Sequence, residues 1–167
     1  MEARPKIDVP QTPADRAGEL LAGSALVLLW ALTIWSFFTL PATIPVHFNG
    51  AGVPDRYGEK GSLLLLPLVA TVLFAALSAA GKFPHVLNYP AEITPANALG
   101  HYRGAIRLAR GLKIGMVLIF LLLVFQTGQT ATVKTAGLGA WFMPVALGLV
   151  VVLPGLWYWM TVARARD

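Results

Sequence analysis

The stretch LPATIPVHFNGAGVPDRYGEKG, residues 40–61, carries more local structural signals than any other part of this 167-residue chain. It contains three prolines, four glycines, one histidine, two acidic and two basic residues, and it lies between two long apolar runs. Pro45 restricts Ile44 to extended backbone, and Asn49-Gly50 is a strong turn signal. The stretch therefore predicts a structured loop between two helices, either a small β-hairpin or a compact Ω-loop.

The apolar residues around this loop and beyond it are gathered in four blocks: Leu20–Leu40, Leu63–Ala80, Ile114–Phe125 and Leu138–Val162. Only 13% of the residues are charged, against about 25% in a soluble domain. The first and fourth blocks reach the roughly 20 residues that cross a bilayer. The second falls slightly short, and the third spans as residues 108–127 if Arg110 and Lys113 snorkel. The sequence predicts an all-α integral membrane protein with four transmembrane helices.

The basic residues indicate an orientation. Of the thirteen lysines and arginines, we expect ten on one side of the membrane, leaving Arg56, Lys60 and Lys134 on the other. The positive-inside rule then predicts that both termini are cytoplasmic and that the loop of residues 41–61 faces outward. We expect the first apolar run to be a retained membrane anchor, because it is longer than the apolar core of a signal peptide.

This topology predicts one membrane domain, residues 19–162, between cytoplasmic tails of residues 1–18 and 163–167. Its connections are outer loops at 41–61 and 126–137 and an inner loop at 82–111. Within the inner loop, Thr94 as N-cap and Pro95 as first helical residue predict an amphipathic helix. That helix either lies on the cytoplasmic surface or runs directly into the third transmembrane helix. Its arginines are expected to contact anionic lipid headgroups.

Two further patterns concern the helices. Gly111-x-x-x-Gly115 matches the small-residue packing motif, and we expect it to mediate helix contact within the monomer. Pro144 and Pro154 predict kinks in the fourth helix, which either relieve packing or open a groove. No ionisable side chain is expected between the helix ends, with Glu19 at the inner boundary. That absence argues against a proton-coupled pump or a voltage sensor.

Several classes of chemistry are excluded or disfavoured. The chain contains no cysteine, which excludes disulfides, thiolate nucleophiles and cysteine-ligated metal centres. His47, Asp55 and Glu59 share the outer loop and are weak candidates for a metal site, but their spacing matches no zinc pattern. Pairing of His47 with Asp55 or a loop carbonyl is the simpler interpretation, as is salt bridging of the loop acids to Arg56 and Lys60. We expect no enzyme activity, no cofactor and no nucleic-acid partner.

The motif Leu40-Pro41-x-x-Ile44-Pro45-x-His47-Phe48-Asn49-x-x-Gly52-x-Pro54-Asp55-x-Tyr57-Gly58-x-Lys60 resembles the signature of a bacterial membrane domain of unknown function. That domain forms the first part of Sdp-type toxin-immunity proteins. A second motif, Asn88-Tyr89-Pro90-x-x-Ile93-Thr94-x-x-Asn97 with Tyr102 and Arg107 following, is similar to the inner loop of small stand-alone members. The resemblance implies a shared four-helix layout, and the best-known relative protects its host from a secreted peptide toxin.

The leading hypothesis is a non-enzymatic membrane protein, resembling immunity or signalling proteins, whose outer loop recognises an extracytoplasmic peptide or protein. The alternative is an accessory structural subunit of a larger membrane complex, and a loop-based metal site or metalloenzyme is a third class. The candidate ligand-binding residues of the outer loop are His47, Asn49, Asp55, Tyr57 and Lys60. The candidate residues of the inner loop, for lipid or a partner, are Asn88, Tyr89, Thr94, Asn97, Arg103, Arg107 and Arg110.

Overall fold

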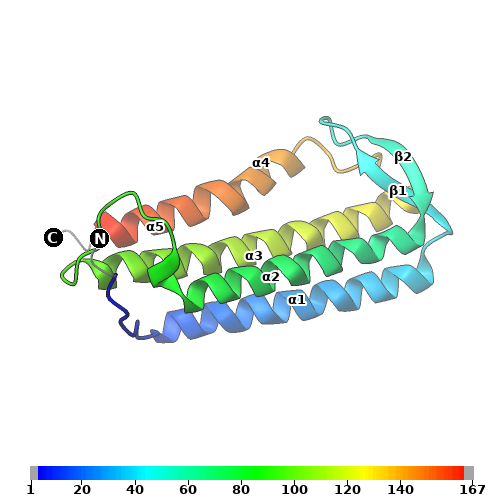
Figure 1. Cartoon of the computed structure of the whole chain (residues 1–167). Helices are drawn as coiled ribbons and strands as arrows, with labels where there is room; N and C mark the ends of the chain where they lie inside the picture. Colours follow the sequence, from blue (N-terminus) through cyan, green and yellow to red (C-terminus); the bar gives the residue numbers. More distant parts are fainter. Residues whose placement is uncertain (1–3, 164–167) are drawn as a thin grey trace.

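The computed structural model describes residues 4–163 and shows a bundle of long helices with a β-hairpin at one end (Figure 1). The elements, in chain order, are α1 (Pro13–Thr39), β1 (Thr43–Phe48), β2 (Pro54–Glu59), the 3₁₀ helix η1 (Lys60–Leu64), α2 (Leu65–Lys82), the 3₁₀ helix η2 (Pro84–Val86), α3 (Ala98–Ala131), α4 (Phe142–Leu147), the π-helical segment η3 (Gly148–Val152) and α5 (Leu153–Ala163).

Four helical segments of the described residues are long and apolar enough to cross a membrane: Pro13–Thr39, Lys60–Lys82, Ala98–Ala131 and Phe142–Met160. The predicted mostly helical fold with four such helices is therefore confirmed. The hairpin end of the molecule holds β1, β2 and the α3–α4 connection (Figure 1). The opposite end holds the start of α1, the end of α2 and the start of α3 (Figure 1).

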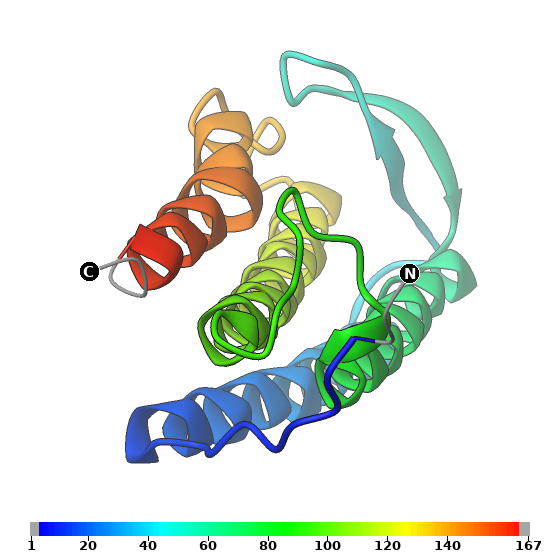
Figure 2. The same cartoon turned by 60° about the vertical axis from the view of Figure 1, so that its left-hand side comes forward.

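The helix α3 is central to the bundle. It packs against α1, α2 and α5, and its far end contacts β1; Figure 2 shows it between the α1–α2 pair and the α4–α5 arm. The apolar core formed by these contacts consists of Ala25, Leu29, Leu40, Ile44, Leu63, Ala70, Val117 and Val124. Outward-facing residues of the helices remain apolar, for example Trp35 and Phe38 at 63% and 77% exposed. Such a surface suits contact with a lipid bilayer.

The first helix begins earlier than the apolar run predicts. Thr12 and Asp15 form a capping box, in which the Asp15 amide donates to Thr12 Oγ1 (3.2 Å) and the Thr12 amide to Asp15 Oδ2 (2.9 Å). Pro13 occupies the first helical turn, where its missing N–H costs nothing. Residues 13–18, expected in a tail, are therefore the first turns of α1.

The third helix is continuous from Ala98 to Ala131. The sequence left two possibilities for the amphipathic segment, and the structure shows it running directly into the third membrane-spanning helix. Its predicted start at Thr94 and Pro95 is wrong, because the Asn97 side chain accepts from the Thr94 amide (2.9 Å) and donates to the Glu92 carbonyl (2.9 Å). These bonds hold residues 92–97 in a turn. At its other end, α3 includes residues 126–131, which were expected in a loop.

The glycine motif on α3 contacts the last helical arm. An ideal Cβ on Gly111 would lie 3.3 Å from Cβ of Pro154, and one on Gly115 would collide with the Leu149 carbonyl oxygen. This is the intramolecular helix contact that the spacing predicted. The fourth membrane-spanning segment deviates from α-helix at Gly148–Val152, between Pro144 and Pro154. The carbonyl of Leu149 in this π-helical segment is the atom that Gly115 accommodates.

Candidate functional site

The β-hairpin is held by backbone pairing and by a side-chain-stabilised turn. Thr43 lies opposite Glu59 and Phe48 opposite Pro54, with irregularities on both sides of His47. Asn49 Oδ1 accepts from the amides of Ala51 (3.0 Å) and Val53 (3.1 Å). Asn49 is therefore the residue that closes the turn, as its pairing with glycine indicated.

The tip of the hairpin is fastened to the connection between α3 and α4. The Leu138 amide donates to the Gly52 carbonyl at 2.8 Å. Gly52 has a φ of 76°, and a Cβ there would lie 3.2 Å from the Gly139 backbone nitrogen. Glycine is required at this position for both its backbone conformation and its close approach. The contact connects the hairpin to the α4 side of the molecule, across a cavity.

That cavity has a volume of about 570 Å³, within the range of ligand-binding pockets. Its walls are β1, the start of the α2 segment, the far end of α3 and the first residues of α4. Apolar side chains predominate in it, including Leu63, Leu66, Leu123, Phe142 and Met143. The polar side chains of His47, Asn49, Arg56, Ser62 and Thr127 also line it.

An unpaired strand edge borders the cavity. All residues from Ile44 to Asn49 line it, whereas from β2 only Arg56 does. The sheet has two strands among the described residues, so β1 is paired with β2 on one edge and unpaired on the other. The cavity thus combines apolar side chains with the free edge of a β-strand.

The five predicted residues of this loop do not form one cluster. His47 Nδ1 and Asp55 Oδ1 lie 2.6 Å apart, with side chains 52% and 43% exposed. Tyr57 is exposed. Lys60 lies at the base of the hairpin, where Nζ donates to the Leu40 carbonyl (3.3 Å). Only His47 and Asn49 of the five line the cavity.

The predicted ion pairing of the hairpin acids is correct only in part. Among residues 4–163, Asp55 pairs with His47, while neither Arg56 nor Lys60 forms an ion pair with a hairpin carboxylate. Glu59 does not complete a metal site with His47 and Asp55, because no three potential ligand side chains in the described part of the chain lie close enough to hold an ion.

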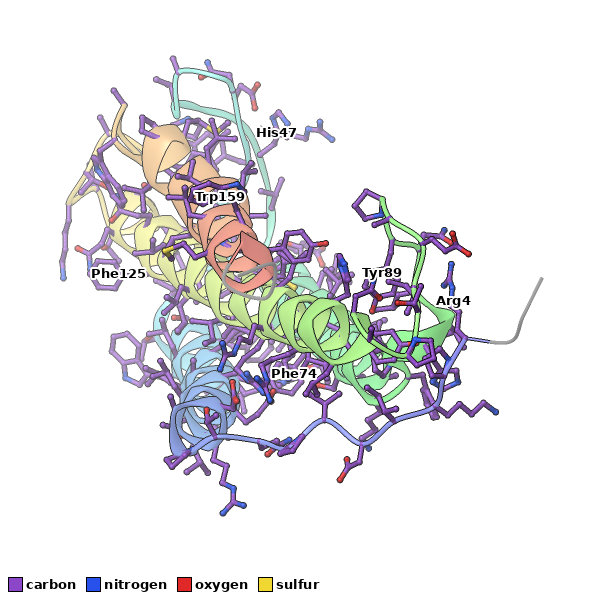
Figure 3. The ribbon with its side chains drawn as sticks, turned by 90° about the vertical axis from the view of Figure 1, so that its left-hand side faces the viewer. Arg4, His47, Phe74, Tyr89, Phe125 and Trp159 are labelled. Carbon is purple, nitrogen blue, oxygen red and sulfur yellow. The ribbon has the colours of Figure 1, made fainter. Side chains whose placement is uncertain are left out.

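At the opposite end of the molecule, the inner-loop candidates mainly hold the chain in place. The Tyr89 hydroxyl donates to the Pro84 carbonyl (2.9 Å), and its ring packs against Tyr102 with centroids 5.7 Å apart. Arg4 lies over the same ring at 5.8 Å (Figure 3). Burial raises the pKa of the Tyr89 hydroxyl above its usual value. Thr94 and Asn97 belong to the turn before α3, and Asn88 is exposed.

Two of the three candidate arginines, Arg107 and Arg110, belong to an ion-pair cluster with Asp15, Glu19 and Lys113, whereas Arg103 does not. Arg110 donates to Asp15 Oδ1 (2.6 Å) and to Glu19 Oε1 (3.0 Å), and Lys113 donates to Glu19 Oε2 (2.5 Å). Arg107 reaches Asp15 at 3.3 Å. Arg110 and Lys113 are only 1% and 3% exposed. The expectations that Arg110 contacts lipid headgroups and that both side chains snorkel to the interface are therefore wrong.

The cluster also connects α1 and α3 to α2. Lys113 Nζ donates to Ser78 Oγ (3.1 Å) and lies 4.9 Å from the centre of the Phe74 ring, which is labelled in Figure 3. The sequence carried a signal for this cluster that the apolar runs obscured. Asp15 and Glu19 are four residues apart on one helix, and the basic residues of α3 recur at three and four, so each set lies on one helix face.

Residues 25–71 match the family model described as Domain of unknown function (DUF1648). The matched segment runs from the middle of α1 through both hairpin strands into α2. An uncharacterized protein of Archaeoglobus fulgidus is 32% identical to this chain over 90 residues, which cover 49% of each protein. The similarity thus spans about half the length of that relative. No solved structure matches the chain.

Proposed function

We propose that this protein is a non-enzymatic membrane protein whose hairpin end recognises a peptide segment of an extracytoplasmic partner. The observation that carries this proposal is the cavity of about 570 Å³ bordered by the free edge of β1. A peptide in extended conformation can add to such an edge through main-chain hydrogen bonds while its alternate side chains enter apolar pockets. The cavity beside β1 offers apolar side chains for this purpose.

The distribution of basic residues supports an outward-facing hairpin. Among the lysines and arginines of residues 4–163, only Arg56, Lys60 and Lys134 belong to the hairpin end. The positive-inside rule then assigns both termini to the cytoplasm. We further propose that the membrane is a bacterial inner membrane, as the resemblance to toxin-immunity proteins implies. A secreted peptide toxin is one kind of ligand that this resemblance suggests.

The polar groups of the hairpin support binding more than catalysis. His47 and Asp55 are bonded to each other and about half exposed, so their pairing stabilises the hairpin around its irregular register. Catalytic acids and bases are more commonly held in a water-excluded cleft. Binding energy at this end would come instead from the strand edge and from apolar contacts.

Panning of a random peptide library against the protein in nanodiscs tests the proposal. Met143→Glu places a charge on the cavity wall at a side chain that is 50% exposed, and Val53→Glu is the matched control on the hairpin outside the cavity. We expect enriched peptides to bind Met143→Glu at least about tenfold more weakly than wild type, because an apolar wall has gained a charge. Binding to Val53→Glu should stay within about twofold of wild type.

N-methylation of the peptide amides that face β1 should abolish binding, because those amides would donate to the strand edge. N-methylation of the alternate amides, which point away from β1, should be tolerated. Peptides that bind both charge variants equally well would overturn the assignment to this cavity. Failure to enrich any peptide would do the same. Isolation of a stoichiometric companion from mildly solubilised membranes, without peptide binding, would support the accessory-subunit alternative instead.

A further inference from the structure

A surplus of positive charge surrounds two adjoining cavities at the end of the molecule opposite the hairpin. The cavities have volumes of about 240 and 250 Å³ and share Lys82 and Arg110 in their walls. The five cationic side chains around them are Lys82, Arg103, Arg107, Arg110 and Lys113, and the three carboxylates are Asp8, Asp15 and Glu19. Two positive charges are thus in excess.

The two inner carboxylates are already used by the ion-pair cluster. Asp15 binds Arg107 and Arg110, and Glu19 binds Arg110 and Lys113. Those three cations and two carboxylates leave one positive charge in the cluster. Lys82 and Arg103 form no ion pair among the described residues and share the cavity wall with one carboxylate, Asp8, which leaves the second positive charge. Both of these side chains line the 240 Å³ cavity, together with Arg107.

One of these cations has an unsatisfied buried donor. The Nε atom of Arg103 is buried and has no hydrogen-bond partner in the described structure. An unpaired donor of a charged group is costly to bury. Arg107, about a quarter exposed, uses only Nε toward Asp15 among the described contacts, so the rest of its guanidinium can bind a second acceptor.

We propose that the 240 Å³ cavity is a binding site for a phosphate monoester, with Arg103, Arg107 and Lys82 as its cationic ligands. A phosphate monoester carries about −1.5 to −2 charges at pH 7 and presents three acceptor oxygens. Its charge thus matches the surplus of two, whereas one carboxylate or phosphodiester would neutralise only half of it. The arginine forks suit bidentate binding of phosphate oxygens.

The walls of the cavity allow two sources for this group. Residues 7–11 of the N-terminal segment form one side, and this segment is held against the bundle by the bond from the Tyr102 hydroxyl to the Pro5 carbonyl (3.0 Å). The other walls are the ends of α1, α2 and α3, where the apolar helices end. Phosphatidic acid in the bilayer and a soluble phosphate both carry the phosphate group that the cavity would bind at this end of the molecule.

Equilibrium binding to purified protein in phosphatidylcholine nanodiscs separates the sources. One arm titrates inorganic phosphate against chloride at equal ionic strength, and the other incorporates phosphatidic acid at increasing mole fraction. Thermal stability and the intrinsic fluorescence of the protein report binding. The variants are Arg103→Gln and Lys82→Gln, and the control is Arg16→Gln, an exposed arginine at the same end of the molecule that lines neither cavity.

We expect phosphate or phosphatidic acid to stabilise the wild-type protein, and Arg103→Gln to weaken that binding by about tenfold, since it loses charge-assisted hydrogen bonds. The control should bind like wild type. Stabilisation by phosphatidic acid alone would identify a lipid site, and stabilisation by both would identify a general phosphate site. Absence of binding in both arms would overturn the proposal. Equal binding by Arg103→Gln and Arg16→Gln would also overturn it.

Discussion

Single residues set how closely the backbone elements of this molecule approach one another. Gly115 on α3 accommodates the Leu149 carbonyl of the π-helical segment, and Gly52 accommodates the Gly139 backbone at the hairpin tip. A side chain at position 115 would occupy space that the Leu149 carbonyl oxygen already fills, and one at position 52 would lie tightly against the Gly139 backbone nitrogen, at 3.2 Å. Close backbone approach of this kind stabilises membrane helix pairs through van der Waals contact.

Replacement of Gly115 by alanine should therefore destabilise the protein by about 1–3 kcal/mol, because overpacking against backbone cannot be relieved by a rotamer change. Gly148→Ala is the matched control, since a Cβ at that position would lie within 4 Å of no described atom beyond its chain neighbours and the nearby backbone of its own helix. The measurement is the free energy of unfolding in mixed micelles titrated with denaturing detergent. Equal stability of the two variants would show that α3 and the η3 segment are further apart than described.

At the scale of elements, the ion-pair cluster explains how three helices are held in register at the end opposite the hairpin. Arg110 is 1% exposed and bonded to two carboxylates of α1. Lys113 extends the same network to Ser78 on α2. The pairing orients α1 relative to α3 more specifically than apolar packing does, because each bond requires one rotation and one axial position of both helices.

Removal of Arg110 should leave the buried Asp15 carboxylate with Arg107 as its one remaining cation and Glu19 with Lys113 as its own, among the described residues. We expect Arg110→Met to lower the free energy of unfolding by about 3–5 kcal/mol, whereas Arg16→Met, at an exposed site on the same end, should change it by less than about 0.5 kcal/mol. The double variant Arg110→Met with Asp15→Asn should recover part of the loss. Similar unfolding curves for Arg110→Met and Arg16→Met would mean that the cluster is solvated rather than buried.

The hairpin is the second element whose placement has consequences. It is fastened at its base by Lys60 on the Leu40 carbonyl and at its tip by the Leu138–Gly52 hydrogen bond. With both attachments, β1 borders a cavity instead of projecting freely from the bundle. The proposed peptide site depends on this placement, since neither the strand edge nor the apolar wall would suffice alone.

At the scale of the whole molecule, the two ends differ in chemistry. The hairpin end has a mainly apolar cavity and a strand edge, and the opposite end has buried ion pairs and a cationic cavity. Between them, the apolar helices are of a length that crosses a membrane. The proposed orientation assigns peptide recognition to the outside and phosphate binding to the cytoplasmic side.

The absence of cysteine from the sequence makes this orientation directly testable. Tyr57→Cys and Arg16→Cys place single thiols at exposed positions of the two ends. We expect a membrane-impermeant maleimide to label Tyr57→Cys in intact cells and Arg16→Cys only after the membrane is permeabilised. Labelling in the reverse pattern would invert the topology and place the hairpin cavity in the cytoplasm.

Local sequence signals were sufficient for much of the fold. Four apolar runs predicted four membrane-spanning helices, and the turn signal at Asn49-Gly50 predicted an ordered loop between the first two. The pairing of His47 with Asp55 was one of the two partners considered, since both share that loop. These features depend on contacts between residues near in sequence or on segment composition, which a single chain displays directly.

Helix ends were predicted less well. Hydropathy placed the start of the first helix too late, and the helix-start signal at Thr94 and Pro95 placed the start of the third too early. The first helix begins at Pro13, where the capping box starts it, and the third begins at Ala98, after the turn that Asn97 holds. In both cases a polar side chain bonded to nearby backbone determines the boundary. Hydropathy does not report such bonds, although the Thr12-Pro13-x-Asp15 pattern was visible in the sequence.

The sequence by itself determined the number of apolar helices, the ordered loop between the first two, and the charge asymmetry between the ends. Only the tertiary structure decided which polar residues meet. Asp15 and Arg110 are separated by 95 positions in the chain and share a hydrogen bond of 2.6 Å. The cavity beneath β1 likewise combines residues from the hairpin, α3 and α4. Such contacts depend on the rotation and register of packed helices, which the packing of the whole bundle determines and which no local pattern encodes.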